Sequence, residues 1–319
     1  MRKGIFAIIS AVLCFVLILS AVGCVAFEKP LYSESETYPM IGSEPSNTEQ
    51  PTQKPTEKRT EKQTQKQTQK QTQKQTQKQT QKQTEPPVTF RVRFASYNIY
   101  HGGNNKDLKK IAANITNNGI EVVGLQEVDN NTSRSGKVNQ VKRLSELTGY
   151  KYYQFFKAIS LEGGEYGLAI LSKYPIESTN RIKLSSGSAE QRILGHAVIN
   201  VNGEKINFFV THLSYDGESG GASRSKQFSE VATELAKHDN FVLSGDFNTR
   251  NLAEYEVIAG SKLVNSRENP HITYPDGKSP LDNLVYSTST WKFGAINVVT
   301  QSYSDHYMIH SVGTFTKKK

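Results

Sequence analysis

The sequence changes abruptly in composition near residue 88, and this change limits what the chain can fold into. Residues 63–84 repeat Gln-Lys-Gln-Thr with a period of four. A helix of this repeat would place like charges on one face and would have no apolar face to bury. We therefore expect a disordered tether over 24–88. Residues 89–316 have ordinary globular composition and are long enough to form one α/β core.

The positive charge of the chain lies mostly outside this domain. The whole chain carries a formal charge of +9, but residues 89–316 hold 24 Lys and Arg against 22 Asp and Glu. A surface that binds duplex DNA usually carries a basic patch. The count argues against duplex DNA as a partner of the domain without excluding it. The basic tether is read as a solvated spacer, with contact to wall polymers, anionic lipid or nucleic acid as the alternative.

The N-terminus has the pattern of an export signal. Arg2 and Lys3 precede an uncharged run over 4–27, and small residues stand directly before Cys24. This arrangement resembles the lipobox of bacterial lipoproteins, which implies that residues 1–23 are removed as a signal peptide and that Cys24 carries lipid. The run is also long enough to span a bilayer, so an uncleaved transmembrane anchor is the alternative. Both interpretations place the domain on the extracellular face of the cytoplasmic membrane.

Strand and helix patterns mix through the domain. Strands are expected where apolar residues alternate or cluster, and helices where they recur every three or four residues. The expected strands are 90–98, 121–126, 167–172, 193–201, 205–211, 240–244, 284–287 and 307–314, and the expected helices are 106–117, 138–147 and 222–237. Hairpins and crossovers both occur in this order. We therefore predict a mixed-sheet α/β or α+β domain.

Polar side chains stand where several expected strands stop. These residues are Asn98, Glu127, His212, Asp246, Asn248, Asp282, Asp305 and His306. Sites are commonly built at strand ends in α/β sheets. Because the domain has no cysteine, grouped carboxylates indicate a hard divalent cation held by oxygen, and histidines beside them indicate acid–base chemistry. Taken singly, each residue also has a plain structural explanation, such as a turn, a cap or a buried histidine.

Taken in chain order, the segments around these residues resemble the endonuclease/exonuclease/phosphatase superfamily, which includes deoxyribonuclease I and neutral sphingomyelinases. The matching segments are 96–99, 125–128, 166–176, 210–213, 244–249, 281–284 and 304–307. The resemblance implies a four-layer sandwich, in which two mixed β-sheets pack face to face with helices outside. It also implies hydrolysis of a phosphate ester by in-line attack of water, with Mg²⁺ or Mn²⁺ as cofactor. We expect a monomer.

The resemblance also assigns roles to residues. It implies metal binding by Asn98, Glu127 and Asp305, and catalysis by His212, Asp246, Asn248, Asp282 and His306. His212 and Asn248 are implied to contact the phosphoryl oxygens, and Asp282 to fix the tautomer of His306. Asp246 is implied to orient or deprotonate the attacking water. The choice between Asp246 and His306 as the base stays open at this point.

Four further residues carry weaker expectations. Glu165 precedes a segment where some relatives place a glutamate that orients a histidine. Arg192 and Arg224 are read as ion-pair partners, with a phosphate contact as the alternative. Asn283 stands where many relatives have tyrosine, which puts a substrate contact in doubt.

The substrate class stays open among nucleic acid, a phospholipid head group and a small phosphate ester. Besides an enzyme anchored to the membrane by its N-terminal lipid, two other functions are compatible with the sequence. One is a catalytically inactive family member that acts as a surface binding module. The other is a lipoprotein in which the tether itself, as a spacer in the cell wall, matters most.

Overall fold

The computed structural model describes residues 86–104, 106–215 and 223–317. The expected signal peptide, the lipidated Cys24 and nearly all of the expected tether lie outside the described residues. Within the described residues, no helix is both long enough and apolar enough to cross a membrane.

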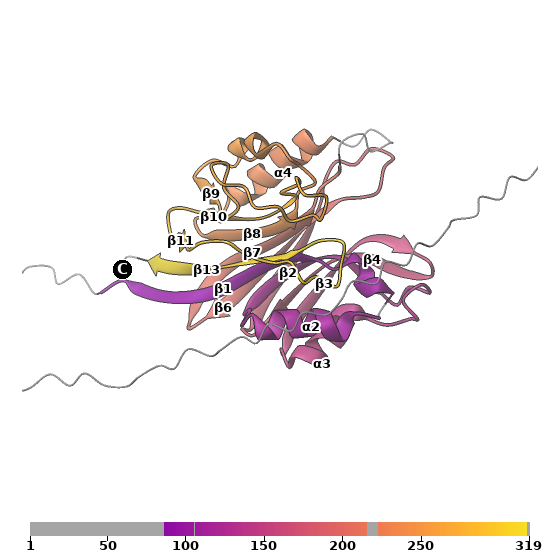
Figure 1. The fold of residues 1–319 in the computed structure, drawn as a ribbon. Coiled ribbons are helices and arrows are strands. Elements are labelled where there is room, and N and C mark those ends of the chain that lie inside the picture. The colour runs from indigo at the N-terminus through magenta and orange to yellow at the C-terminus, as the bar shows by residue number, and fades with distance from the viewer. Residues whose placement is uncertain (1–85, 105, 216–222, 318–319) are drawn as a thin grey trace, which may run out of the picture. The chain divides into compact units, whose positions relative to one another are not determined.

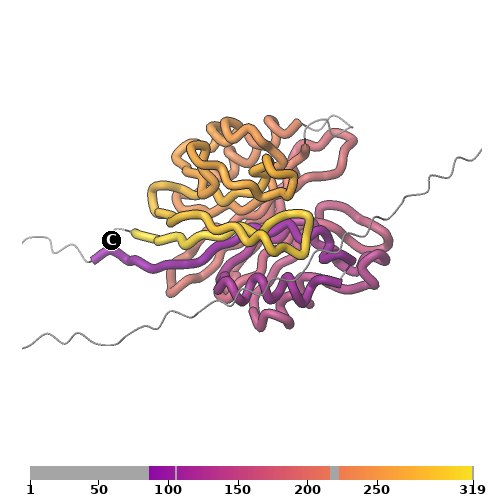
Figure 2. Tube along the Cα trace, in the orientation of Figure 1, coloured from indigo at the N-terminus to yellow at the C-terminus, as the bar shows by residue number. Residues whose placement is uncertain are grey.

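One sheet, sheet A, contains both ends of the described chain. Its strands follow the order β11-β13-β1-β2-β4-β3, and β12 pairs with β13. Their bounds are β1 Val88–Asn98, β2 Val122–Asn130, β3 Tyr152–Leu161, β4 Gly164–Ser172, β11 Trp291–Phe293, β12 Asn297–Val299 and β13 Met308–Lys317. β1 runs parallel to β2 and antiparallel to β13. Figure 2 shows β1 and β13 side by side.

The other sheet, sheet B, lies between these segments in the sequence. Its strands follow the order β5-β6-β7-β8-β10-β9. Their bounds are β5 Ile176–Lys183, β6 Ile193–Val201, β7 Glu204–His212, β8 Phe241–Asp246, β9 Ser261–Leu263 and β10 Asp282–Ser287. β7 and β8 are parallel, and β10 returns antiparallel beside β8. Each sheet therefore contains one parallel pair near its centre.

The two sheets pack face to face around a shared core. In β1, Val92 and Phe94 face sheet B, while Ala95 and Tyr97 face the helices on the other side, as the alternation of a strand buried on both faces requires. Phe94 stacks on Phe208 of β7, with ring centroids 5.6 Å apart.

Helices cover the two outer faces. Sheet A is covered by α2 (Leu108–Asn117) and α3 (Gln140–Thr148), and sheet B by α4 (Arg224–Leu235) and the 3₁₀ helix η2 (Leu252–Val257). Figure 1 shows α2 and α3 on one side of the sheets and α4 on the other. The predicted four-layer sandwich of two mixed sheets is confirmed.

Two long strands, β3 and β5, were not predicted. Both lie at the edge of a sheet, where one side of the strand has no neighbour. Six of the eight residues of β5 are exposed, and its sequence is mostly polar. Edge strands of this kind are stabilised by backbone pairing rather than by an apolar face, so they leave little hydrophobic periodicity in the sequence.

Candidate active site

The site lies at the edge of the sandwich where the parallel strands end. On sheet A, Asn98 is the last residue of β1, and Glu127 lies in β2 where the pairing with β4 shifts register between Leu125 and Val128. Glu127 adopts a left-handed backbone conformation with φ of 57°. Such a bulge changes the direction of one side chain in a strand. The Glu127 carboxylate is thereby brought to the Asn98 side chain, 3.0 Å away.

Sheet B supplies the other half of the site. His212 ends β7 and Asp246 ends β8, and the two residues are paired in the parallel register. β10 begins at Asp282, directly opposite Asp246. Asn248 follows with φ of 52°, and its backbone N–H donates to Asp246 Oδ1 at 3.0 Å. The strand ends therefore place these four polar side chains together.

The loop before β13 completes the group. Ser304 donates from its hydroxyl to the Asn98 carbonyl oxygen at 2.7 Å, which holds this loop against the end of β1. The loop carries Asp305, which is half-buried, and His306, which is buried. The end of the first strand and the loop before the last strand of the described chain thus meet at one place.

The buried side chain of Asn98 connects the two sheets. Its Nδ2 donates to Glu127 Oε1 and to Asp246 Oδ2, both at 3.0 Å. Its Oδ1 accepts from the backbone N–H of Tyr100 at 3.1 Å, which fixes the orientation of the amide. Tyr100 begins a turn over 100–104 in which every residue has a left-handed φ, from 42° to 58°. The Tyr100 N–H bond to Oδ1 therefore links the strained turn to the orientation of the Asn98 amide.

His306 is held between two carboxylates. Its Nδ1 lies 2.8 Å from Asp282 Oδ2, and its Nε2 lies 3.4 Å from Asp246 Oδ2. Burial alone would lower the pKa of His306, but Asp282 and Asp246 outweigh burial and raise it to about 10. The ring of Tyr274 packs edge-on against His306, with centroids 5.0 Å apart. His306 is therefore a protonated donor at neutral pH.

His212 has the opposite environment. Its Nδ1 lies 3.3 Å from Arg192 Nη1, and its Nε2 lies 3.0 Å from Asn248 Nδ2 and 3.6 Å from Asp246 Oδ2. Burial, reinforced by the positive charge of Arg192, lowers the pKa of His212 to about 3. His212 is therefore neutral at neutral pH, and both histidines present Nε2 toward Asp246.

The donor set fits a hard divalent cation. Asp246, Asp282 and His306 can bring one ligand atom each within 4.8 Å of the others, but the proton of His306 already places a positive charge there. Glu127 offers oxygen ligands together with the second lone pair of Asn98 Oδ1. Burial and the charges of Asp305 and Asp246 raise the pKa of Glu127 to about 7. A cation beside Glu127 would relieve this crowding of negative charge.

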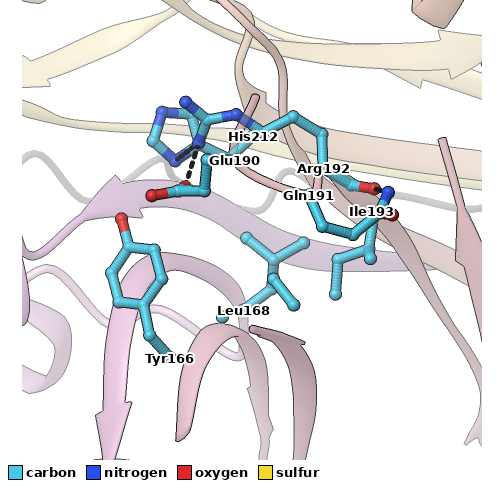
Figure 3. Close-up of a pocket in the computed structure, with 9 residues that line it drawn as sticks. Tyr166, Leu168, Glu190, Gln191, Arg192, Ile193 and His212 are labelled. Atoms are coloured by element: carbon cyan, nitrogen blue, oxygen red, sulfur yellow. Dashed lines mark hydrogen bonds and ion pairs between the residues drawn. The ribbon is translucent and has the colours of Figure 1, made fainter. Parts of the chain in front are cut away.

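A small pocket adjoins the site on the side of His212. It is lined by Ala158, Tyr166, Gly167, Leu168, Glu190, Gln191, Arg192, Ile193 and His212. Figure 3 shows the hydroxyl end of Tyr166 directed toward Glu190, and Arg192 between Glu190 and His212. The Nη1 of Arg192 lies 2.9 Å from Glu190 Oε1. The pocket therefore has an apolar floor and a charged rim that reaches His212 of the candidate site.

The weaker expectations have different outcomes. The Glu165 carboxylate lies 3.0 Å from the Asn130 side chain and 3.2 Å from Lys157 Nζ, and within the described residues no hydrogen bond or ion pair joins it to a histidine. The residue that contacts His212 Nδ1 is Arg192. An orienting role for Glu165 therefore stays a prediction that no contact among the described residues supports.

Arg224 and Asn283 have structural contacts. Arg224 forms an ion pair with Glu254 at 2.9 Å and donates to the Asn248 carbonyl oxygen at 3.0 Å. It thus supports the left-handed turn at Asn248. The side chain of Asn283 is buried and accepts from the backbone N–H of Asn265 at 2.9 Å. It holds the start of β10 in place.

Two aromatic residues at the site were not singled out from the sequence. Tyr166 lies within a matching segment but had no assigned role, and its pKa is raised well above the usual value by burial and by Glu127. Tyr274 belongs to no motif, and it is near His306 only because residues 273–281 fold back against β10. Tyr166 could have been predicted as a site residue from its position inside a matching segment, whereas nothing in the sequence indicates Tyr274.

Comparisons with known proteins agree with this geometry. The profile of the Endonuclease/Exonuclease/phosphatase family matches residues 95–306. No curated protein sequence matches the chain significantly. Among solved structures, an endonuclease/exonuclease/phosphatase from Beutenbergia cavernae is 20% identical with a TM-score of 0.59, over 70% of this chain and 72% of that one.

Two further solved structures carry more specific names. A mannosyl-6-phosphatase from Bacteroides thetaiotaomicron is 17% identical with a TM-score of 0.55, over 69% of this chain and 98% of that one. TDP2 from D. rerio, solved with a single-strand DNA product, is 16% identical with a TM-score of 0.55, over 70% of this chain and 98% of that one. At these identities the likeness is one of fold.

Proposed function

This chain belongs to the endonuclease/exonuclease/phosphatase family, whose members are phosphoesterases, and from that membership we propose a specific chemistry. The proposal is hydrolysis of phosphate ester bonds by in-line attack of water, dependent on Mg²⁺ or Mn²⁺. One observation carries it. Asn98 joins Glu127 of sheet A to Asp246 of sheet B, so an oxygen-rich half and a histidine-rich half meet in one cluster.

The oxygen-rich half is the proposed metal site. Glu127 would be the main ligand, with Asn98 and Asp305 beside it. A bound divalent cation would neutralise charge on the phosphate and polarise its oxygens. Mg²⁺ and Mn²⁺ favour oxygen ligands, and Mg²⁺ keeps several waters, so few carboxylates suffice.

The histidine-rich half supplies a proton acceptor and directed donors. Because Asp282 and Asp246 keep His306 protonated, His306 is suited to donate to a phosphoryl oxygen rather than to act as a base. Asp246 is then the carboxylate available to orient the attacking water and accept its proton. Asn248 and His212 also lie against Asp246, and we expect them to donate to the charge that develops on the phosphoryl group.

The substrate is proposed only by its shared chemistry, a phosphate ester. The similar solved structures include a mannosyl-6-phosphatase and a protein solved with a DNA product. Mannose 6-phosphate and DNA are both phosphate esters. The near-neutral charge of residues 89–316 favours lipid head groups or small esters over duplex DNA.

Turnover assays with defined substrates test this proposal. The purified chain is incubated with bis-p-nitrophenyl phosphate, p-nitrophenyl phosphate, mannose 6-phosphate, single-stranded and plasmid DNA, and sphingomyelin, with Mg²⁺, Mn²⁺ or EDTA. We expect turnover of at least one ester that EDTA abolishes and added metal restores. Asp246→Asn should lower kcat by about 10²- to 10⁴-fold, since it removes the proton acceptor.

The matched control is Asp239→Asn, which makes the same change at an exposed carboxylate. It should leave turnover unchanged. Binding of a phosphate ester by a folded protein, with no metal-dependent turnover of any substrate, would instead establish the inactive binding module.

We also propose that the chain is a lipoprotein held on the extracellular face of the cytoplasmic membrane by Cys24. The support is the sequence pattern around this cysteine. Metabolic labelling with a radioactive fatty acid tests it. The wild-type chain should be labelled and shortened, and Cys24→Ala should be neither. A chain of full length and without label, still in the membrane fraction, would indicate the transmembrane anchor.

A further inference from the structure

A buried glutamine lies in the first turn of one outer helix on each side of the sandwich. Gln140 is the first residue of α3, which covers sheet A, and Gln227 lies in the first turn of α4, which covers sheet B. Both side chains are completely buried. Burial of an amide is unfavourable unless its oxygen and its nitrogen both find partners. The partners of these two amides therefore show which segments they hold.

Gln140 joins the two segments that carry the oxygen-rich half of the site. Its Oε1 accepts from the backbone N–H of Asp129 at 2.8 Å, and its Nε2 donates to the carbonyl oxygen of His101 at 2.6 Å. Asp129 stands two residues after Glu127 in β2, and His101 lies in the turn that follows Asn98. The strand pairing of β1 with β2 ends at Asn98. Beyond that point, the Gln140 side chain takes the place of β1 beside β2.

The turn that Gln140 holds determines the orientation of Asn98. His101 has a left-handed φ of 42°, which is unfavourable for a residue with a side chain and persists only when surrounding contacts hold it. The preceding residue, Tyr100, donates from its backbone N–H to Asn98 Oδ1 at 3.1 Å. The bond from Gln140 to His101 therefore acts through this turn on the place where Asn98 meets Glu127.

Gln227 makes the corresponding contacts at the histidine-rich half. Its Oε1 accepts from the backbone N–H of Ser214 at 2.9 Å, and its Nε2 donates to the carbonyl oxygen of Ser185 at 2.8 Å and to Ser214 Oγ at 2.9 Å. Ser214 lies in the segment directly after β7. In that segment the carbonyl oxygen of Leu213 accepts from Asn248 Nδ2 at 3.0 Å. Gln227 therefore holds this segment where it contacts Asn248.

We propose that Gln140 and Gln227 are positioning residues, one for each half of the candidate site. Each amide oxygen faces an N–H and each amide nitrogen faces a carbonyl oxygen, so only one orientation of each amide satisfies both partners. Gln140 then sets the affinity of the proposed metal site, and Gln227 sets the position of Asn248. These effects on metal binding and catalysis rest on the proposed function, whereas the backbone positions do not.

Binding of Mn²⁺ to the full chain without substrate tests the role of Gln140. Gln140→Met removes both hydrogen bonds at similar length and should raise the Kd for Mn²⁺ by about 10- to 100-fold, as measured by isothermal titration calorimetry. Gln227→Met buries the same new side chain on the other sheet and should change this Kd little. Gln154→Met is the control for the substitution itself, because Gln154 donates only locally, to the Phe155 carbonyl oxygen on edge strand β3. An unchanged Kd in a folded Gln140→Met variant, or an equal rise in Gln227→Met, would contradict the proposal.

Amide hydrogen exchange in EDTA measures the backbone positions without metal or substrate. The reporters are the backbone N–H groups of Tyr100 and Asn248, since each donates to a side chain of the site. Gln140→Met should speed exchange at Tyr100 by about 3- to 10-fold, as expected when one hydrogen bond is weakened, and leave Asn248 unchanged. Gln227→Met should do the reverse. The same pattern in both variants, or no change in either, would overturn the proposal.

Gln140→Glu is the second variant if Gln140→Met does not fold. It keeps the shape of the side chain and the acceptor for the Asp129 N–H, but it loses the amide donor to His101. It should therefore also speed exchange at Tyr100. Slow exchange at Tyr100 in this variant would show that the bond to His101 does not hold the turn.

Kinetics separate the two roles. With the substrate found in the turnover assays, Gln227→Met should lower kcat by about 10- to 100-fold even at saturating Mn²⁺, because Asn248 is misplaced. The loss in Gln140→Met should be recovered largely by raising the Mn²⁺ concentration. A loss that saturating Mn²⁺ does not recover would contradict the role of Gln140. If the wild-type chain neither binds Mn²⁺ nor hydrolyses any ester, the proposed function fails, and the exchange rates still decide the positioning roles.

Discussion

At the scale of single residues, two histidines that share the neighbour Asp246 differ in protonation: His306 is a cation and His212 is neutral. His306 and His212 both direct Nε2 toward Asp246 Oδ2, at 3.4 Å and 3.6 Å. The difference lies at Nδ1, which meets the carboxylate of Asp282 in one ring and the guanidinium of Arg192 in the other. Burial lowers the pKa of both rings, and the second contact reverses this effect at His306, where Asp282 helps to keep the ring a cation, and reinforces it at His212, where Arg192 helps to keep the ring neutral.

Asp282→Asn tests this at His306. The variant keeps an acceptor for Nδ1 but removes the charge, so the pKa of His306 should fall from about 10 toward its ordinary value of about 6.5. We expect kcat at pH 8 to fall by about 10²-fold, since much of the ring would lose its donor proton. NMR titration of the metal-free protein measures the pKa. A pKa still near 10 would show that Asp282 is not the main cause.

The raised pKa of His306 also predicts the direction in which the stability of the folded protein changes with pH. The raised pKa means that folded His306 holds its proton more tightly than the unfolded chain does. Its stabilising contribution is present below about pH 6.5 and is lost as the pH rises through 10. In EDTA, wild type should therefore lose more stability over this range than Asp282→Asn, as measured by urea unfolding.

At the scale of secondary-structure elements, β13 carries a buried histidine, His310, that is not part of the candidate site. His310 pairs with Ala95 of β1 and Asn297 of β12, and its Nδ1 has no hydrogen-bond partner among the described residues. Burial and the nearby charge of Arg93 lower the pKa of His310 to about 4. Protonation of this ring is therefore less favourable in the folded protein than in the unfolded chain.

This predicts acid sensitivity of β13. Because the unfolded chain takes up a proton near pH 6.5 and the folded chain only near 4, stability falls as the pH drops between these values. A shift of this size corresponds to about 3 kcal/mol. The free energy of unfolding of wild type should fall by about that much more than that of His310→Gln between pH 7 and pH 4. Parallel curves for the two proteins would contradict the prediction.

The elements also show what the sequence can predict. β1 was predicted because its buried faces alternate, and Asn98 was predicted because it stands where that alternation stops. β5 was not, because an exposed edge strand has no such signal. The contact of Arg192 with His212 was not predicted either, since Arg192 directly precedes β6 and His212 ends β7, and their proximity depends on how these two strands pair. Motifs in the sequence predicted which polar residues gather at the candidate site, whereas the contacts among their neighbours became visible only in the fold.

At the scale of the whole molecule, the site depends on how closely the two sheets approach. Its oxygen-rich half belongs to sheet A and its histidine-rich half mainly to sheet B. Near the site the sheets meet where Gly124 of β2 packs against Ser244 of β8. A Cβ atom at Gly124 would lie 1.9 Å from Ser244 Oγ and 3.0 Å from Val210 Cγ2. Because Gly124 has no side chain, the two sheets can approach closely enough for Asn98 to hydrogen-bond both Glu127 and Asp246.

A double-variant cycle tests this spacing. Gly124→Ala should destabilise the protein by about 1–3 kcal/mol through overpacking and should lower kcat, because it pushes Asn98 and Asp246 apart. Ser244→Ala should cost little, since the buried Ser244 hydroxyl has no hydrogen-bond partner among the described residues. The combined variant should regain part of both losses, because the nearest clashing atom is gone. Urea unfolding and turnover measure the cycle, and strictly additive effects would show that this contact does not set the distance between the two halves of the site.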